Sequence, residues 1–287
     1  MPRIDAISEQ TYDVANQTTF LLQVAAQPCE SQEIVDESLT LTGPVDSGAL
    51  EEHTLTGESN RLHRFVCPPG RVTIRYAATV ETELSIADGV QESETLAHLP
   101  PETIRYTVPS RYCESDKLAD WAGQTFGHLH ADDSRVMAIA NWIFDHFAYT
   151  PGATDASTSA ADIILSGGAS PGTDKPYQGV CRDYAHVMIA TCRALDIPAR
   201  YVSGYVANLQ PPDFHALVEV YVGNGWYLHD PTRLAPRTGL VRIARGLDAA
   251  ETAFCTLIGS AQLVEQTVSA VRTDGEVDSD PVRVRVD

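Results

Sequence analysis

The fold of this chain can best be predicted from the stretch Gly179-Val-Cys-Arg-Asp-Tyr-Ala-His-Val-Met-Ile-Ala-Thr-Cys-Arg-Ala-Leu-Asp196. It begins as a loop, continues with apolar residues three and four apart, and stops at Ile197-Pro198. One face of the resulting helix carries Cys181, Tyr184, Ala185, Met188, Cys192 and Leu195. The pattern predicts a helix buried under a sheet, with Cys181 in its first turn.

The position of Cys181 suggests a nucleophile. Unpaired N–H groups and the positive dipole end at the start of a helix favour a thiolate over a thiol. A thiolate is the nucleophile that attacks an amide carbonyl. Cys192 lies mid-helix on the core face and is predicted to be a packing residue. A lone cysteine is more often a buried structural thiol, so the hypothesis depends on partners for Cys181.

The sequence after this helix predicts strands. Ala199–Val206 reads as one strand, and residues 214–222 and 225–230 read as the two arms of a hairpin that ends at Pro231. The first arm carries His215 and the second carries Asp230.

The turn of this hairpin sets the distance between the two polar side chains. A two-residue Gly223-Asn224 turn pairs Leu217 with Asp230 and makes Asp230 a diagonal neighbour of His215, within reach of its side chain. The alternative Asn224-Gly225 turn moves Asp230 two residues farther away. We favour the first register, or a four-residue loop with the same pairing.

Cys181, His215 and Asp230 then supply a nucleophile, a base that deprotonates it, and a carboxylate that fixes the tautomer of the base. Such a triad needs no metal and no organic cofactor. His186 and His229 point away from this group in the predicted elements, and His128-Leu-His130 has no convergent third ligand for a metal.

Four motifs carry a family resemblance. G-V-C-R-D-Y-A-H, I-P-A-R-Y-V-S-G-Y, H-A-x-V-E-V-Y and W-x-x-x-D-P-T closely resemble the bacterial transglutaminase-like superfamily, whose members are also described as cysteine proteases. The resemblance covers about residues 135–235. It implies an α+β fold with a papain-like core, a Cys-bearing helix on an antiparallel sheet, and a triad of Cys181, His215 and Asp230.

The chain departs from the family pattern in three places. A Gly-Ala-Ser-Pro-Gly-Thr insertion precedes the nucleophile, and Arg233 stands where relatives commonly have Asn after Pro-Thr. The segment Arg245–Ala250 only loosely resembles the downstream motif of the family. These differences leave the triad intact and concern the choice of substrate.

The resemblance implies acyl transfer through a thioester with a protein or peptide as substrate. Transfer to water makes a peptidase or amidase, whereas transfer to an amine makes a transglutaminase. We expect hydrolysis, with amine transfer as the alternative. A third hypothesis is a binding domain that keeps the fold without turnover, and the intact triad argues against it.

Further residues near the motifs are candidates for substrate binding. Tyr149, Gln178 and Trp226 flank the motifs and would line the acyl site, with Gln178 donating to an oxyanion beside the Cys181 N–H. Each of these types is more often a packing or loop residue. The Gly- and Ser-rich segment 166–178 is long enough to act as a rim or lid.

The N-terminal part of the sequence has the pattern of short strands. Short runs of β-branched and aromatic residues alternate with Pro, Gly, Asp and Ser clusters, at residues 18–24, 38–42, 62–66 and 71–76. We expect a β-sandwich-like domain at 1–90, a linker at 91–110 and the catalytic domain at 111–287. The strand-like segment 280–287 fits the sheet of either domain.

Composition limits the partners. The 287 residues carry a net charge of −19, which disfavours nucleic acid and anionic membrane surfaces. No apolar run approaches the length of a membrane span, and the first residues lack the features of a signal peptide. Six cysteines lie far apart without a C-x-x-C pair, so reduced thiols and a cytoplasmic protein are expected.

Overall fold

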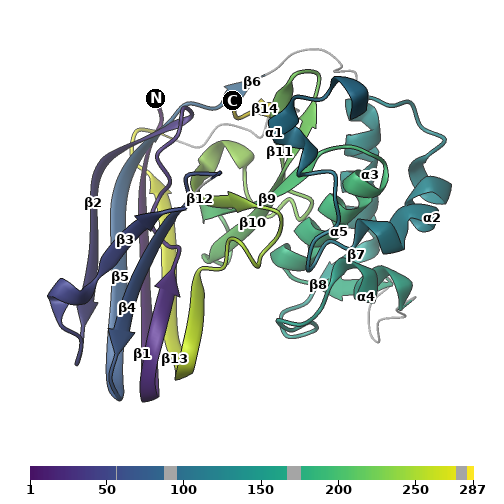
Figure 1. Cartoon of the computed structure of the whole chain (residues 1–287). Helices are drawn as coiled ribbons and strands as arrows, with labels where there is room; N and C mark the ends of the chain where they lie inside the picture. The colour runs from purple at the N-terminus through teal and green to yellow at the C-terminus, as the bar shows by residue number, and fades with distance from the viewer. Residues whose placement is uncertain (56, 87–95, 167–175, 276–282) are drawn as a thin grey trace.

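Two six-stranded antiparallel sheets and a group of helices form the chain in the computed structural model, which describes residues 1–55, 57–86, 96–166, 176–275 and 283–287. Figure 1 shows the N-terminal sheet at the left, the helices at the right and the second sheet between them. The α+β class expected from the sequence is therefore confirmed.

The N-terminal sheet is built around one long strand. β1 pairs with β5 along its first half and with β4 along its second half, while β13 runs along its other side. Register shifts near Tyr12 and Asn16 bend β1 between the two halves. The strands are β1 (Arg3–Leu22), β2 (Gln32–Thr42), β3 (Glu51–Thr54), β4 (Arg61–Cys67), β5 (Gly70–Thr82) and β13 (Cys255–Arg272). The β-rich N-terminal unit predicted from the sequence is confirmed.

The second sheet carries the predicted hairpin. Its strand order is β12-β9-β10-β11-β14-β6. The strands are β6 (Ser85–Ile86), β9 (Ala199–Val206), β10 (Phe214–Val222), β11 (Gly225–His229), β12 (Leu240–Gly246) and β14 (Val284–Arg285). β14, from the C-terminal segment left unplaced by the sequence, pairs with β11 and β6.

The strands do not follow the domain division expected at residues 90 and 111. β13 comes from the expected catalytic domain but completes the N-terminal sheet, and β6 comes from the N-terminal side but joins the second sheet. Local sequence pattern cannot reveal such pairings, because the partners lie far apart along the chain. Within the expected linker, residues 91–95 lie outside the described part, and Pro101–Ile104 forms the short helix α1.

The helices agree closely with the sequence pattern. The segments predicted at 115–122 and 133–147 form α2 (Ser115–Phe126) and α3 (Asp133–His146). The Asp132 carboxylate accepts the Ser134 N–H at 2.8 Å and so caps α3. The remaining helices are α4 (Ala160–Leu165) and α5 (Cys181–Ala194), and the short parallel strands β7 (Phe147–Tyr149) and β8 (Tyr177–Gly179) precede α5.

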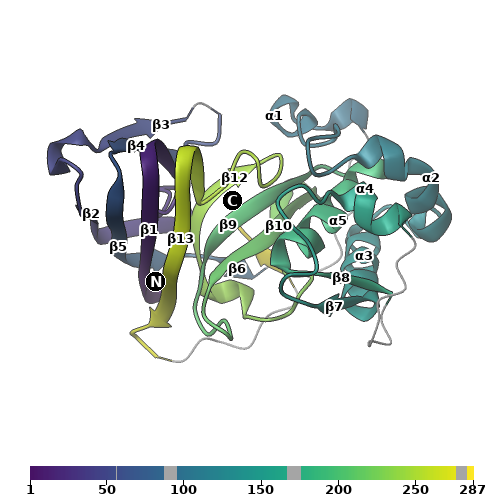
Figure 2. The same cartoon turned by 90° about the horizontal axis from the view of Figure 1, so that it is seen from below.

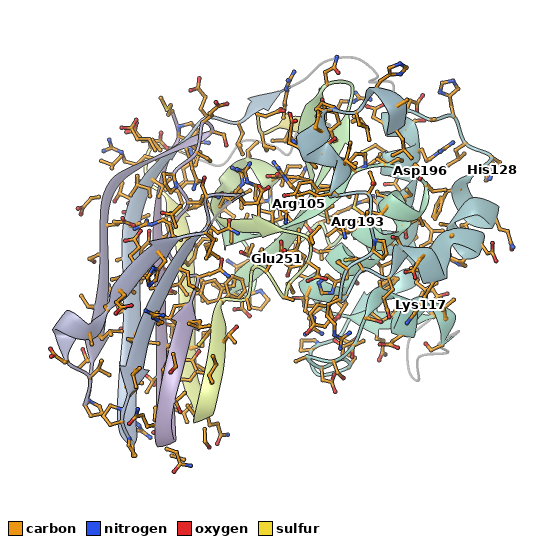
Figure 3. The ribbon with its side chains drawn as sticks, in the orientation of Figure 1. Arg105, Lys117, His128, Arg193, Asp196 and Glu251 are labelled. Carbon is orange, nitrogen blue, oxygen red and sulfur yellow. The ribbon has the colours of Figure 1, made fainter. Side chains whose placement is uncertain are left out.

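α5 is the central helix of the half of the molecule that contains the helices and the second sheet. Every residue from Asp183 to Arg193 is buried, between α2 and α3 on one side and β9 and β10 on the other. Cys192 is fully buried, so the predicted packing role is confirmed. The Arg193 guanidinium donates to the carbonyls of Ala199 and Leu247 and fixes the end of the helix. Figure 3 shows Arg193 inside this layer, whereas His128 lies at the outer end of the helical part.

The two sheets share a hydrophobic core. Tyr76 of β5 stacks on Tyr205 of β9 with ring centroids 6.2 Å apart, and the Tyr205 hydroxyl donates to the Val24 carbonyl at 2.7 Å. The view from below in Figure 2 shows β13 and β1 beside β9, β10 and β12. The N-terminal sheet therefore packs directly against the second sheet. No helix in the described part of the chain is both long and apolar enough to cross a membrane.

Candidate active site

Cys181 begins α5, as the sequence predicts. The helix starts here because the Asp183 carboxylate turns back to accept the Val180 N–H at 2.9 Å. Thr154 donates to the same carboxylate at 2.5 Å, and the Arg182 guanidinium contacts it at 2.9 Å. This fully buried carboxylate fixes the first turn of α5. Sequence reasoning missed Asp183, although an acidic residue at the third helix position is the usual signal for such a cap.

His215 and Asp230 meet as the hairpin geometry predicts. Gly223 and Asn224 form the turn with φ of 54° and 65°, and β10 and β11 pair Val222 with Gly225. This is the register favoured from the sequence, and it is confirmed. Asp230 follows the last paired residue of β11, and its Oδ2 lies 2.9 Å from Nε2 of His215.

Thr232 completes the carboxylate site, and sequence reasoning missed it. Its backbone N–H and its hydroxyl both donate to Oδ1 of Asp230, at 2.9 and 2.6 Å. One oxygen of Asp230 is thereby held by Thr232, so the other faces the imidazole of His215. The Pro231-Thr232 pair after the aspartate was the available signal, since a hydroxyl two residues on often bonds such a carboxylate.

Burial and charge set the protonation of this group. Burial lowers the pKa of His215, but the Asp230 carboxylate and a hydrogen bond with Cys181 outweigh it and raise the pKa to about 10. Burial raises the pKa of Asp230, but the His215 charge and the Thr232 donors bring it below its usual value. Because Asp230 binds Nε2, the other ring nitrogen is the one available to the sulfur of Cys181. The His215 ring thus lies between the Asp230 carboxylate and the Cys181 sulfur.

A cavity of about 360 Å³ opens beside the sulfur. This volume lies within the range of small-ligand sites. Residues from both halves of the molecule surround it. Those outside the N-terminal sheet are Tyr112, Ala156, Cys181, Arg182, Tyr201, His215, Ala216 and residues 249 and 252–254. The N-terminal sheet contributes Gln10 and Tyr12 on β1 and Cys255 and Gln266 on β13. The wall from the N-terminal sheet was not foreseen, because it depends on the return of β13 to β1.

The three candidate substrate residues lie in different places. Tyr149 of β7 hydrogen-bonds Cys181, and burial together with that sulfur raises its pKa. Gln178 of β8 lies opposite Ala148 and is partly exposed, but it is not among the residues that surround the cavity.

Trp226 does not fit the substrate role expected for it. It pairs with Tyr221, six residues or roughly 20 Å along the strand from His215. The Arg200 guanidinium lies 3.8 Å from its ring centroid, and its side chain is buried. Its nearness to the motif in sequence does not bring it near the sulfur, because the hairpin is extended.

The remaining candidates stay apart from the triad. His186 is fully buried and its Nε2 accepts the Ala249 N–H at 3.2 Å, and His229 is buried on the other side of Asp230 beside Arg237. Within the described residues no three His, Cys, Asp or Glu side chains form a metal-binding group. Most of the loop predicted at 166–178 lies outside the described residues.

Comparison with known proteins agrees with this geometry. The transglutaminase-like superfamily matches residues 119–231, and the bacterial transglutaminase N-terminal domain matches residues 3–101. A crystal structure from Cytophaga hutchinsonii is 37% identical, with a TM-score of 0.90, over 99% of this chain and 96% of that one. The chain belongs to the transglutaminase-like superfamily.

The related proteins carry the following descriptions. The Cytophaga hutchinsonii protein is described as a "Putative Cysteine Protease". The uncharacterized protein ML0607 of Mycobacterium leprae is 29% identical over 132 residues, which is 43% of each chain. The uncharacterized protein Rv2569c of Mycobacterium tuberculosis is 32% identical over 112 residues, or 39% of this chain and 32% of that protein. The chain therefore matches less than half of the length of these two mycobacterial proteins.

Proposed function

We propose that this transglutaminase-like protein hydrolyses amide bonds of proteins or peptides through a thioester on Cys181. The observation that carries the proposal is the 2.9 Å contact of His215 Nε2 with Asp230, which leaves the other ring nitrogen to Cys181. Cys181 and His215 both border the same cavity. No metal or organic cofactor has a part in this reaction.

The proposed reaction has two steps. The Cys181 thiolate attacks the amide carbonyl, and the C–N bond breaks as the imidazolium of His215 gives its proton to the leaving amine. The neutral imidazole then takes a proton from water, which attacks the thioester and releases the acid and the thiolate. Asp230 holds the ring in place and stabilises its charge.

Backbone N–H groups at the start of α5 are the proposed donors to the oxyanion. The backbone N–H of Cys181 belongs to the first turn, where N–H groups have no partner within the helix and the dipole is positive. Donors placed there stabilise the negative oxygen that forms when the thiolate attacks. We include Gln178 in the proposal as a second donor, because β8 leads directly into this turn.

Water rather than an amine is the proposed acceptor. The support is the Cytophaga hutchinsonii relative, described as a "Putative Cysteine Protease", which is similar over nearly the whole chain. We further propose a cytoplasmic location, since all six cysteines are free thiols and the reaction needs a reduced Cys181.

An unfolded protein that offers both peptide bonds and glutamine side chains tests the proposal. Reduced and carbamidomethylated lysozyme is incubated with the enzyme and a primary amine, and products are read by mass spectrometry. We expect peptide cleavage or glutamine deamidation by the wild type and none by Cys181→Ala or His215→Ala, while Cys192→Ala keeps the activity. Amine incorporation as the main product would make the protein a transglutaminase, and absence of every product would leave a binding domain.

A further inference from the structure

The outer edge of β13 has no strand partner among the residues that the structure describes. This strand of 18 residues pairs with β1 along one side, and no other described strand pairs with it. Figures 1 and 2 show β13 at the border of the N-terminal sheet, on the side of the catalytic half. An unpaired edge presents a row of backbone N–H and C=O groups that can bind another extended chain.

The direction of these backbone groups follows from one hydrogen bond. The Thr273 N–H donates to the Arg3 carbonyl at 2.9 Å, and pairing continues in step from Arg272 to Glu265. Residues of an antiparallel ladder alternately face the partner strand and the opposite side. The residues in phase with Thr273 therefore face β1, and the N–H and C=O groups of the others face the outer edge, namely those of Gln266, Val268 and Ala270.

The edge lacks the usual protection against strand pairing. Natural edge strands carry lysine, proline or several charges that prevent pairing. From Cys255 to Val271 the only charged residue is Glu265, and there is no Lys or Pro. Leu263 and Val264 are 42% and 45% exposed just before Gln266. The middle of β13 thus carries a single charge, and its residues 262–267 are exposed.

Gln266 connects this edge with the candidate active site. Its side-chain Nε2 donates to Asp213 at 2.9 Å, and its Oε1 accepts from Gln10 at 3.3 Å. Asp213 lies two residues before His215. Gln266 and Cys255 also border the cavity of Cys181 and His215. A chain paired with β13 at Gln266 would therefore pass beside the sulfur.

We propose that an extended segment of the polypeptide substrate adds to the outer edge of β13 as a further strand and thereby presents a side chain or backbone amide to Cys181. This inference rests on the proposed function and names its substrate class, an unfolded or extended polypeptide. Alternate side chains of a strand point to opposite faces, so one of them enters the cavity while the backbone binds the edge. A second copy fits less well, because each chain carries a net charge of −19.

Hydrogen exchange on the full chain with Cys181→Ala tests the proposal without turnover. The probe is reduced and carbamidomethylated lysozyme, an unfolded polypeptide of opposite net charge. We expect added protection of amides within residues 262–270 when the probe binds, because their outward N–H groups gain acceptors. Protection elsewhere only would overturn the proposal. Protection that rises with the concentration of the chain alone would overturn it in favour of a second copy.

Two variants at position 266 distinguish the contribution of the backbone N–H to binding from that of the side chain. In the Cys181→Ala background, Gln266→Pro removes the outward N–H, whereas Gln266→Met keeps it and removes only the side-chain bonds. We expect Gln266→Pro to bind the probe about fivefold more weakly than Gln266→Met, as for one lost hydrogen bond. Equal affinities would overturn backbone pairing. The exchange measurement on Cys181→Ala gives an answer even if Gln266→Pro does not fold.

The two proposals fail in distinguishable ways. Protected β13 amides together with no product from the wild type would refute the hydrolase and leave β13 as a docking strand. Cleavage without any change at β13 would refute the docking strand and leave the hydrolase.

Discussion

Thr232 holds Asp230 with two donors, a backbone N–H at 2.9 Å and a hydroxyl at 2.6 Å, both to Oδ1. The second carboxylate oxygen is thereby turned to His215. Thr232 touches neither the sulfur of Cys181 nor the cavity beside it in the described structure, so it is a positioning residue.

Thr232→Val tests this role by removing the hydroxyl and keeping the shape. We expect kcat/KM of amide hydrolysis to fall roughly tenfold, since a charge-assisted hydrogen bond is lost, and Thr232→Ser to restore most of it. The hydroxyl lowers the pKa of Asp230, so the acid limb of the pH profile of kcat should move to higher pH in Thr232→Val. An unchanged pH profile would contradict the positioning role.

Cysteine labelling checks the state of the sulfur. Iodoacetamide on the native protein should label Cys181 first among the six thiols, because it borders an open cavity beside an imidazolium. Cys192 is the matched control on the same helix, since burial raises its pKa to about 12. We expect His215→Ala to slow labelling of Cys181 strongly and to leave Cys192 unchanged. Labelling of both thiols at equal rates, measured by peptide mass spectrometry, would contradict the pairing of Cys181 with His215.

Much of the candidate site could be predicted from local sequence patterns. The Gly223-Asn224 turn fixes the hairpin register within a few residues, so the approach of His215 to Asp230 could be predicted. The apolar spacing predicted a helix with Cys181 in its first turn, and Pro198 predicted where that helix ends.

Contacts between distant segments could not be predicted in this way. The pairing of β13 with β1 joins residues more than 200 positions apart, and it turns Tyr12 and Gln266 into walls of the cavity. Trp226 was assigned to the site because sequence distance hides the length of an extended hairpin. Thr232 and Asp183 were missed although each had a local signal, a hydroxyl two residues after Asp230 and an acidic residue at the third position of the helix.

The titration of His215 is predicted from its two neighbours. Its pKa in the folded protein is raised to about 10, so the imidazolium persists at neutral pH. The contribution of His215 to the free energy of unfolding is fully present below its unfolded pKa of about 6.5. It is lost as the pH rises toward 10. Histidine NMR should show one ring that titrates far above the others, and Cys181→Ala should lower that pKa, because the sulfur contributes to the shift. A ring that titrates near 6.5 in both proteins would contradict this.

The stability of the second sheet is predicted to depend on Glu219. This carboxylate is fully buried in β10 and binds Arg200 of β9 at 2.6 Å and Arg242 of β12 at 2.7 Å. Although burial raises its pKa, the two arginines lower it to about 2. Glu219→Gln leaves the buried Arg242 guanidinium without a carboxylate partner and leaves Arg200 with only Glu58, at 3.5 Å. We therefore expect a loss of about 3–5 kcal/mol in urea unfolding.

An exposed carboxylate provides the control for Glu219. Glu51 on β3 contacts Arg64 at the surface, where both side chains are about half exposed, and Glu51→Gln should leave the unfolding midpoint unchanged. The folded pKa of Glu219 is depressed, so its contribution is present above pH 4.5 and is lost as pH falls toward 2. The difference in stability between wild type and Glu219→Gln should therefore shrink below pH 4.5. A constant difference would show that packing, rather than charge, is what the substitution removes.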